Sequence, residues 1–304
     1  MKRVVSVSLG SDKRDHEVEV ELLGQQIRVE RRGTNGDLAK AFQLIKELDG
    51  QVDAIGLGGI DLYLFAGERR YVLRDAEKLA AAAQQTPVVD GSGLKNTLEP
   101  RIVASLQQQG TLDLRGKKVL MVSGVDRQGM ARAFVEAGSE VVFGDLIFGL
   151  GFPLALRSLK ALNTVAGMVI PLVSRLPFKY LYPTGQQQEE IITGFEKYYQ
   201  EADIVAGDFH YIRRYLPNVL EGKTIITNTV TGGDIEALKA RGARGLITTT
   251  PELKGRSFGT NVMEAMLVAL AGSKTELSAA SYCELLNQLE FKPRVLDFAE
   301  SRIS

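Results

Sequence analysis

The stretch Gly116–Asp145, GKKVLMVSGVDRQGMARAFVEAGSEVVFGD, decides the predicted fold. Apolar residues 119–122 run into Gly124, helical spacing of apolar residues follows from about Gly129, and a second apolar strand ends on Asp145. Strand, tight turn, helix and strand in this order are typical of a dinucleotide-binding βαβ unit. The helix start would face a pyrophosphate, and an acid about 20 residues after the turn would accept hydrogen bonds from ribose hydroxyls.

The middle position of the glycine turn departs from the usual G-x-G-x-x-G pattern. It holds Asp126, whose carboxylate would repel a pyrophosphate unless it turns away or pairs with a cation such as Arg127. Use of the unit only as a scaffold, or for another ligand, therefore stays open. NAD is expected in preference to NADP, because Asp145 would repel a 2′-phosphate. The expected cofactor-binding residues are Gly124, Asp126, Arg127, Gln128, Gly129, Met130, Asp145 and Thr229.

Composition limits the classes of partner. The 304 residues include 37 basic and 37 acidic side chains, so neither nucleic acid nor an anionic membrane is expected as a partner. A single cysteine and two histidines exclude a disulfide within the chain and a Cys/His zinc site, and we expect no metal. The apolar region 146–176 is interrupted by charges and prolines, and the N-terminus resembles a strand more than a signal peptide, so a soluble cytoplasmic protein is expected.

The order of expected elements predicts an α/β protein of two domains. Residues 1–100 should form a small α/β domain, with a strand at 3–9, a hairpin turning at Gly24 and helices at 37–48 and 75–84. A helix at 95–108 should lead into a Rossmann-type, doubly wound and mostly parallel sheet within 101–272. An amphipathic helical segment within 273–304 should pack on the first domain.

Six strands alternating with helices are expected in the second domain. The expected strands are residues 119–122, 141–143, 164–173, 203–209, 223–230 and 244–250. The expected helices include residues 152–162, 185–202, 210–220, 234–242 and 258–272. Ligands in such sheets bind beyond the carboxyl ends of the strands, which makes strand-end polar residues informative.

Residues 86–145 resemble the shikimate and quinate dehydrogenase family. Asp90, Gly91 and Gly93 of TPVVDGSGLKNTLE match the family's N-T-D-G-x-G-type turn, and LRGKKVL matches the entry to its nucleotide domain. The resemblance implies an NAD(P)-dependent oxidoreductase acting on a secondary alcohol of a small cyclic polyol acid bound between the domains. It also implies that the aspartate matched by Asp90 flanks the reacting alcohol. The family's lysine motif has no counterpart, because AIGLGGIDLYL (54–64) contains no lysine.

Asp90, Lys95 and His210 are the candidates for the proton chemistry. Lys95 lies shortly after Asp90 and would restore a Lys/Asp pair, or is a solvated lysine at a helix start. His210, at a strand end beside Asp208, is another candidate base, or only a helix cap. A Rossmann-type enzyme of other chemistry and a nucleotide-sensing protein without turnover stay open as alternatives. The expected partner is a small-molecule substrate, and a homodimer is possible.

Overall fold

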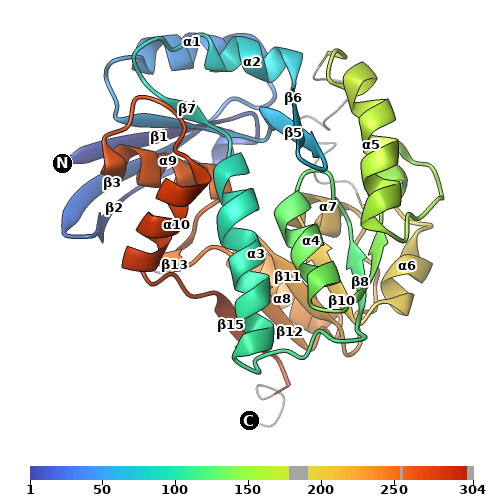
Figure 1. Cartoon of the computed structure of the whole chain (residues 1–304). Coiled ribbons are helices and arrows are strands. Elements are labelled where there is room, and N and C mark those ends of the chain that lie inside the picture. Colours follow the sequence, from blue (N-terminus) through green and yellow to red (C-terminus); the bar gives the residue numbers. More distant parts are fainter. Residues whose placement is uncertain (178–190, 254–255, 300–304) are drawn as a thin grey trace. The chain divides into compact units, whose positions relative to one another are not determined.

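The computed structural model describes residues 1–177, 191–253 and 256–299, and it has an α/β architecture with parallel sheets (Figure 1). These residues divide into two compact units. Unit 1 comprises Met1–Thr97, Phe258–Phe291 and the described part of Met168–Gln188. Unit 2 comprises Leu98–Gly167 and the described parts of Glu189–Ser257 and Lys292–Ser304. Residues 258–272, expected in the second domain, thus belong to unit 1.

Unit 1 is built on a five-stranded sheet of order β2-β3-β1-β4-β7. Its strands are β1 (Lys2–Ser8), β2 (His16–Leu22), β3 (Gln25–Gly33), β4 (Ala54–Gly58) and β7 (Val88–Val89). All pair in parallel except β2, which forms the expected antiparallel hairpin with β3. The hairpin turns at Leu23 and Gly24, whose φ angles of 49° and 70° favour glycine. The parallel strands all end at one edge of the sheet.

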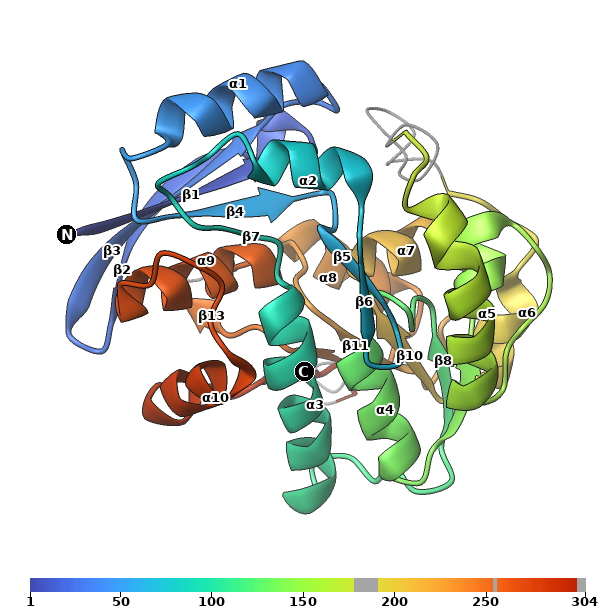
Figure 2. The ribbon, with the colours of Figure 1, turned by 45° about the horizontal axis from the view of Figure 1, so that its top comes forward.

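Helices cover both faces of this sheet (Figure 2). Helices α1 (Leu38–Leu48) and α2 (Arg74–Ala80) lie on one face, and α9 (Thr260–Ala271) packs against β1 and β4 on the other. Strand alternation explains the two layers: Val5 and Val7 point to the α1 side, whereas Ser6 bonds to Asn261 of α9. The smaller elements are the hairpin β5 (Tyr63–Ala66) and β6 (Arg69–Val72) and helix α10 (Ala279–Gln288).

Unit 2 is built on a six-stranded sheet of order β15-β12-β11-β10-β8-β9. Its strands are β8 (Lys118–Met121), β9 (Glu140–Phe143), β10 (Ile204–Gly207), β11 (Thr224–Thr227), β12 (Gly245–Thr248) and β15 (Arg294–Asp297). Five strands are parallel, and β15 is antiparallel to β12. Because β8 lies between β9 and β10, the strand order reverses there, and ligands of open α/β sheets bind at such a point.

Helices also cover both faces of the second sheet. Side chains of α3 (Ser92–Gln108), α4 (Gln128–Glu136) and α5 (Leu159–Val173) share one core with Val119 and Met121. Side chains of α6 (Glu196–Glu201), α7 (Phe209–Arg214) and α8 (Gly232–Ala240) share the other with Leu120 and Val122. Strands buried on both faces read as continuous apolar runs, as the sequence does here. The short pair β13 (Glu252–Leu253) and β14 (Arg256–Ser257) and the π-helix η2 (Asp145–Gly149) complete the described elements of this unit.

The prediction of a third strand at 164–173 is wrong, because these residues belong to helix α5. Leu162, Ala166 and Ile170 are buried at a spacing of four, which is a helical period that the run of apolar and β-branched residues concealed. The sixth strand is β15 instead, which lies where a helical segment was expected. The helix expected at 152–162 is largely irregular chain, and residues 185–190 of the next expected helix lie outside the described residues.

No helix among the described residues combines the length and apolar character needed to cross a bilayer.

Candidate functional site

The glycine turn after β8 is shaped by close packing. A Cβ on Gly124 would lie 2.9 Å from both Phe143 Cδ1 and Leu162 Cδ2, so only glycine fits. The backbone N–H groups of Gly124 and Val125 donate to Asp145 Oδ2 and Oδ1 at 3.1 and 2.8 Å. The turn, the end of β9 and helix α5 therefore depend on one another.

Asp145 lies at the carboxyl end of β9, as expected. Its pKa is raised to about 6, mainly by burial and also by nearby Asp126, against the lowering effect of hydrogen bonds from Val125, Gly124 and its own N–H. A carboxylate has about four acceptor positions, so the side chain retains room for a ribose hydroxyl. Because the N–H groups of Gly124 and Val125 already serve Asp145, they do not face a phosphate.

The start of α4 offers the remaining backbone donors of this turn. Its N-cap residue is Arg127, which makes no capping hydrogen bond with its side chain. The side chains of the next residues are otherwise engaged: Gln128 donates to Asn163 Oδ1 at 2.9 Å, and Met130 lies in the core. The start of α4 is nevertheless a place where an anion is favoured, because the helix dipole is positive there.

Arg127 forms a buried network of ion pairs at the point where the strand order reverses. Its guanidinium has 0% exposure and bonds to Glu99 of α3 and, at 2.7 Å, to Asp208 Oδ2 at the end of β10. Asp126 Oδ2 lies 3.6 Å from Nε, so the unusual carboxylate does pair with Arg127. Burial acts to lower the pKa of Arg127, but the three carboxylates together raise it. Arg127 is one of the expected cofactor-binding residues, but its side chain has no exposed surface and is occupied by these carboxylates.

His210 follows Asp208 at the start of α7 and is held by it. Both the backbone N–H and Nδ1 of His210 lie within hydrogen-bond distance of Asp208 Oδ1, at 2.9 and 3.0 Å. Asp208 Oδ2 accepts from Arg127 and from Asn228 Nδ2, the latter at 2.9 Å. Burial acts to raise the pKa of Asp208, but the hydrogen bond from His210 and the charge of Arg127 hold it well below its usual range.

The threonine hydroxyl groups at the ends of β11 and β12 mostly donate hydrogen bonds to backbone carbonyl groups of the same unit. Thr227 Oγ1 donates to Gly207 O at 2.8 Å, and Thr250 Oγ1 donates to Asn228 O at 2.8 Å. Thr229, expected to bind the cofactor, is half-buried in the turn after β11. Thr227 and Thr250 therefore join neighbouring strand ends.

Asp90 of unit 1 supports the turn in which it lies, a role that an aspartate before a glycine can have without any chemistry. Its Oδ2 accepts from the N–H groups of Leu62 and Tyr63 at 2.6 and 3.2 Å and from Ser92 Oγ at 2.9 Å. Its Oδ1 accepts from Ser92 N at 3.0 Å. Four donors occupy the carboxylate, which is 4% exposed and fixes the chain that follows β4.

The two glycines of the Asp90 turn are required by the close approach of α9 and α10. A Cβ on Gly91 would lie 2.7 Å from Thr260 Oγ1, and one on Gly93 would lie 2.4 Å from Glu264 Oε1. Glu264 also accepts from Tyr282 Oη at 2.5 Å. Burial raises the pKa of Glu264 to about 8, and the charge of Asp90 adds to the effect. Packing thus accounts for the glycine pattern that suggested the family resemblance.

Lys95 pairs with a residue that the sequence did not single out. Its Nζ donates to Asp61 Oδ1 at 2.5 Å, and the two side chains are 5% and 17% exposed. Asp61 follows β4 and Lys95 lies in the first turn of α3 after β7, so the pair lies at the carboxyl edge of the unit 1 sheet.

We expect Asp90→Asn to destabilise unit 1. An amide in place of one carboxylate oxygen leaves a buried N–H donor of Leu62, Tyr63 or Ser92 without an acceptor, which costs about 1–3 kcal/mol. Urea unfolding measures the loss, and Ser92→Ala, which removes only the bond from the hydroxyl, should cost less. An Asp90→Asn variant as stable as the parent would contradict the structural role.

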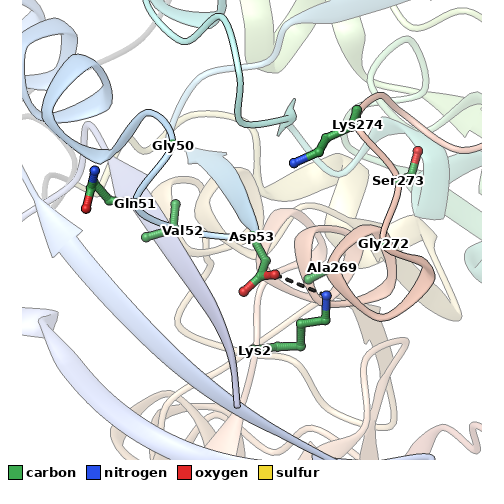
Figure 3. Close-up of a pocket in the computed structure, with 9 residues that line it drawn as sticks. All are labelled: Lys2, Gly50, Gln51, Val52, Asp53, Ala269, Gly272, Ser273 and Lys274. Carbon is green, nitrogen blue, oxygen red and sulfur yellow. Dashed lines mark hydrogen bonds and ion pairs between the residues drawn. The ribbon is translucent and has the colours of Figure 1, made fainter.

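A polar pocket at the opposite edge of the unit 1 sheet is a poor candidate site (Figure 3). Its lining residues are Lys2, Gly50, Gln51, Val52, Asp53, Ala269, Gly272, Ser273 and Lys274. Lys2 begins β1 and Asp53 precedes β4, so the pocket lies at the amino ends of these strands. Ligands of parallel sheets bind at the carboxyl ends, where Asp61, Asp90 and Lys95 lie.

Two family models match the chain in succession. Residues 3–90 match a domain of unknown function (DUF8753), and residues 93–298 match another, described as domain of unknown function (DUF8754). The second match covers more than half of the chain. The chain belongs to the DUF8754 family. Its two matches meet at the Asp90 turn. A search of curated proteins found no match.

Solved structures similar to the chain have low scores and mixed functions. The glucose-galactose binding protein GanP from Geobacillus stearothermophilus has 9% identity and a TM-score of 0.42, with 98% of each chain covered. NAD-dependent malic enzyme from Thermotoga maritima has 10% identity and a TM-score of 0.36, with 95% of this chain and 84% of that chain covered. Malic enzyme from Entamoeba histolytica has 12% identity and a TM-score of 0.40, with 92% and 60% covered. Scores this low support no inference about function.

Three polar residues central to these networks were missed by the sequence reasoning. Glu99 lies in mid-helix and gave no signal. Asp61, in the glycine turn after β4, and Asn228, at the end of β11, had the strand-end position that could have identified them.

Proposed function

We propose that this protein is an NAD-dependent oxidoreductase that acts on a secondary alcohol of a small hydroxy acid. The observation that carries the proposal is the arrangement at the reversal of strand order in unit 2. The glycine turn after β8, the uncapped start of α4 and Asp145 at the end of β9 together resemble the phosphate and ribose sites of Rossmann-type units.

The residues of unit 2 fit a dinucleotide. The start of α4 would face a phosphate, and Asp145 would accept from the ribose hydroxyls. Asp126 does not prevent this, because Arg127 partly offsets its charge. When bound, the nicotinamide would accept a hydride, and with it two electrons, from the alcohol carbon as a carbonyl forms.

Lys95 and Asp61 of unit 1 would bind a polar group of the hydroxy acid. An ion pair at 2.5 Å favours the charged forms of both groups, so Lys95 would act as a hydrogen-bond donor. The polyol acid class, quinate or shikimate among its members, rests on the resemblance of residues 86–145 to the dehydrogenase family.

Two measurements test the proposal. Titration of the full chain with NADH, followed by its fluorescence, should give saturable binding. Absorbance of NADH should then rise with NAD and one member of a panel of quinate, shikimate and other hydroxy acids. Lys95→Met should raise KM for that substrate, whereas the exposed Lys78→Met, which removes a surface ion pair with Asp75, should not. Failure of NADH to bind would overturn the proposal.

Asp126 and the absent lysine motif favour a second candidate, a Rossmann-type enzyme of other chemistry. Saturable NADH binding with no reaction across the panel would support this candidate or a nucleotide-sensing protein without turnover.

A further inference from the structure

We infer that unit 1 contains a binding site for an oxyanion, the carboxylate or phosphate group of a small ligand, formed by Ser8, Arg31 and Asn261. All three residues belong to unit 1. The site goes beyond the proposed function, because it concerns unit 1 alone and needs no dinucleotide in unit 2. If the proposed function is right, the acid group of the hydroxy acid would bind here.

The three residues lie on one face of the unit 1 sheet. Strand β1 pairs with β3 in a register that puts Ser6 opposite Arg31. Side chains alternate between the two faces of a strand, so Ser6, Ser8 and Arg31 share one face. Asn261 lies in the first turn of α9, which packs on this face, and its Nδ2 donates to Ser6 Oγ at 2.9 Å. Because Ser8 ends β1, the site lies at the carboxyl edge of the sheet, where ligands of parallel sheets bind.

The hydroxyl group of Ser8 is buried and has a hydrogen to donate. Its Oγ accepts from Gly10 N at 3.1 Å and from Arg31 Nη2 at 3.0 Å, which occupies both lone pairs of the oxygen. Ser8 is 6% exposed, and among the described residues none accepts its hydroxyl hydrogen. Because buried polar groups nearly always have a hydrogen-bond partner, we expect an acceptor from outside the chain.

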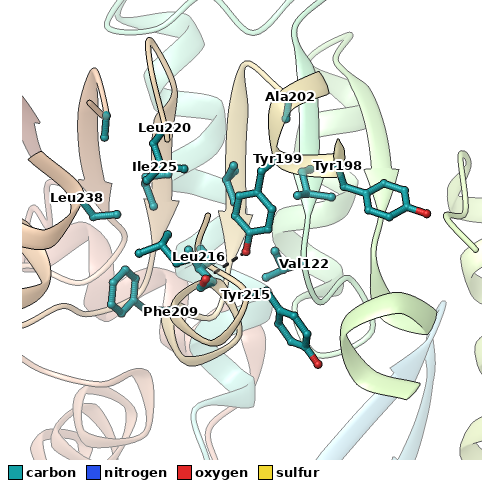
Figure 4. Packing of buried hydrophobic residues seen from close by; sticks show 14 of the residues in the cluster. Val122, Tyr198, Tyr199, Ala202, Phe209, Tyr215, Leu216, Leu220, Ile225 and Leu238 are labelled. Atoms are coloured by element: carbon teal, nitrogen blue, oxygen red, sulfur yellow. Dashed lines mark hydrogen bonds between the residues drawn. The ribbon is translucent and has the colours of Figure 1, made fainter. Parts of the chain in front are cut away.

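Other buried hydroxyl groups, such as those of Tyr199 and Thr227, meet an acceptor within the chain. Tyr199 Oη donates to Ile212 O at 3.1 Å in the core of unit 2 (Figure 4). Thr227 Oγ1 donates to Gly207 O at 2.8 Å. Ser8 differs from these two residues because the described chain supplies its hydroxyl group with two donors and with no acceptor.

The guanidinium of Arg31 also has donors left for a ligand. Its Nη1 donates to Ser11 O at 2.9 Å and to Asp15 Oδ1 at 2.7 Å, and its Nη2 donates to Ser8 Oγ. A guanidinium has five N–H donors, so one hydrogen of Nη2 and the hydrogen of Nε have no acceptor among the described residues. The side chain keeps 13% of its surface exposed, which gives a small ligand access to these donors.

A second positive charge lies beside Arg31. The position that a Cβ on Gly10 would take lies 2.8 Å from Arg14 Nη2 and 3.0 Å from Arg31 Nη2. Burial, and next the charge of Arg14, lower the pKa of Arg31, against the raising effect of Asp15 and Asp12. An oxyanion beside Arg31 would offset both the burial of its charge and the repulsion from Arg14.

Asn261 adds a third donor next to the Ser8 hydroxyl. Its Nδ2 has two hydrogens, of which one is donated to Ser6 Oγ. The position that a Cβ on Gly58 would take lies 3.0 Å from Ser8 Oγ and 3.3 Å from Asn261 Nδ2, so the glycine leaves these two groups close to each other. A water molecule there would itself need acceptors for its two hydrogens, whereas an oxyanion only accepts and also carries the charge that Arg31 favours.

Titration of the full chain with simple oxyanions tests the site. Nitrogen-15 NMR of the backbone amides is followed as sodium phosphate or sodium acetate replaces sodium chloride at constant ionic strength. We expect saturable shifts of the signals of Gly10 and Gly58, with a Kd of about 1–10 mM. The probe with the lower Kd identifies the oxyanion as a phosphate or a carboxylate group. No saturable shift of these signals with either probe would overturn the inference.

The variant Asn261→Asp makes this test specific. Aspartate keeps the shape of asparagine and is favoured in the first turn of a helix, but it replaces a donor by a negative charge. We expect the Kd of the bound probe to rise by about tenfold or more. Asn287→Asp, which adds the same charge on the exposed side of α10, should leave the Kd unchanged. Binding as tight in Asn261→Asp as in the parent protein would overturn the inference.

Arg31→Met removes the positive charge of the site and should raise the same Kd by about ten- to a hundredfold. Arg28→Met, which removes a more exposed charge from the same strand, should change it little. An Arg31→Met variant that binds the probe as tightly as the parent protein would contradict the site. If loss of the bond to Asp15 unfolds this variant, the result for Asn261→Asp decides alone.

The outcome is distinct from that of the proposed function. Shifts of Gly10 and Gly58 with a probe, in a protein that does not bind NADH, would support the site and overturn the oxidoreductase proposal. NADH binding without these shifts would overturn the site and leave the oxidoreductase proposal intact.

Discussion

Replacement of Arg127 by methionine is expected to lower the free energy of unfolding by about 3–5 kcal/mol. The guanidinium has 0% exposure and pairs with Glu99, Asp126 and Asp208, of which Glu99 is equally buried. Methionine fills a similar volume but leaves buried carboxylates without their cation. Urea unfolding followed by circular dichroism measures the change.

Two control variants make this result specific. Arg28→Met removes an exposed pair with Glu17 and a longer one, 3.5 Å, with Glu30, which keeps Arg3 and Arg32 as partners, so it should cost less than about 1 kcal/mol. Glu99→Met combined with Arg127→Met removes a buried charge from each side of the pair and should recover part of the loss. A loss for Arg127→Met no greater than for Arg28→Met would mean that the network is not buried in solution.

Asp145→Ser is expected to weaken NAD binding by about ten- to a hundredfold, because a charged hydrogen bond to the ribose is lost. NADP binding should weaken less or improve, since the repulsion of a 2′-phosphate is also removed. Fluorescence titration with NADH and NADPH measures both constants. Tighter binding of NADPH than NADH to the parent protein would contradict the assigned preference.

The pKa of Asp145 gives this preference a pH dependence. Burial raises the pKa to about 6, so the carboxylate gains its proton as pH falls through that value. Because the ionised form accepts from ribose hydroxyls and repels a 2′-phosphate, the preference for NADH should narrow as pH falls from 8 toward 5 in this titration. The variant Asp145→Asn has no titratable group at this position. Any change of preference with pH that remains in this variant therefore comes from titration of the 2′-phosphate.

The sequence identified the elements whose patterns are local. The apolar run at 119–122, the glycine turn and Asp145 predicted the β8–α4–β9 unit, because strand period, turn chemistry and chain length are set by neighbouring residues. The hairpin at Gly24 followed in the same way. The run at 164–173 failed because apolar β-branched residues suit a buried helix face as well as a strand, and periodicity alone could not separate the two.

The sequence alone therefore determined the α/β class, the βαβ unit at Gly116–Asp145 and the strand-end positions of Asp90, Asp145 and His210. Only the tertiary structure decided what these side chains do. The partners of Arg127 come from α3 and from the end of β10, residues 28 and 81 positions away. Such pairings depend on which strand ends become neighbours in the sheet, and no local pattern records this. For the same reason, no local pattern indicated that Asp90 holds the chain after β4 or that Lys95 pairs with Asp61.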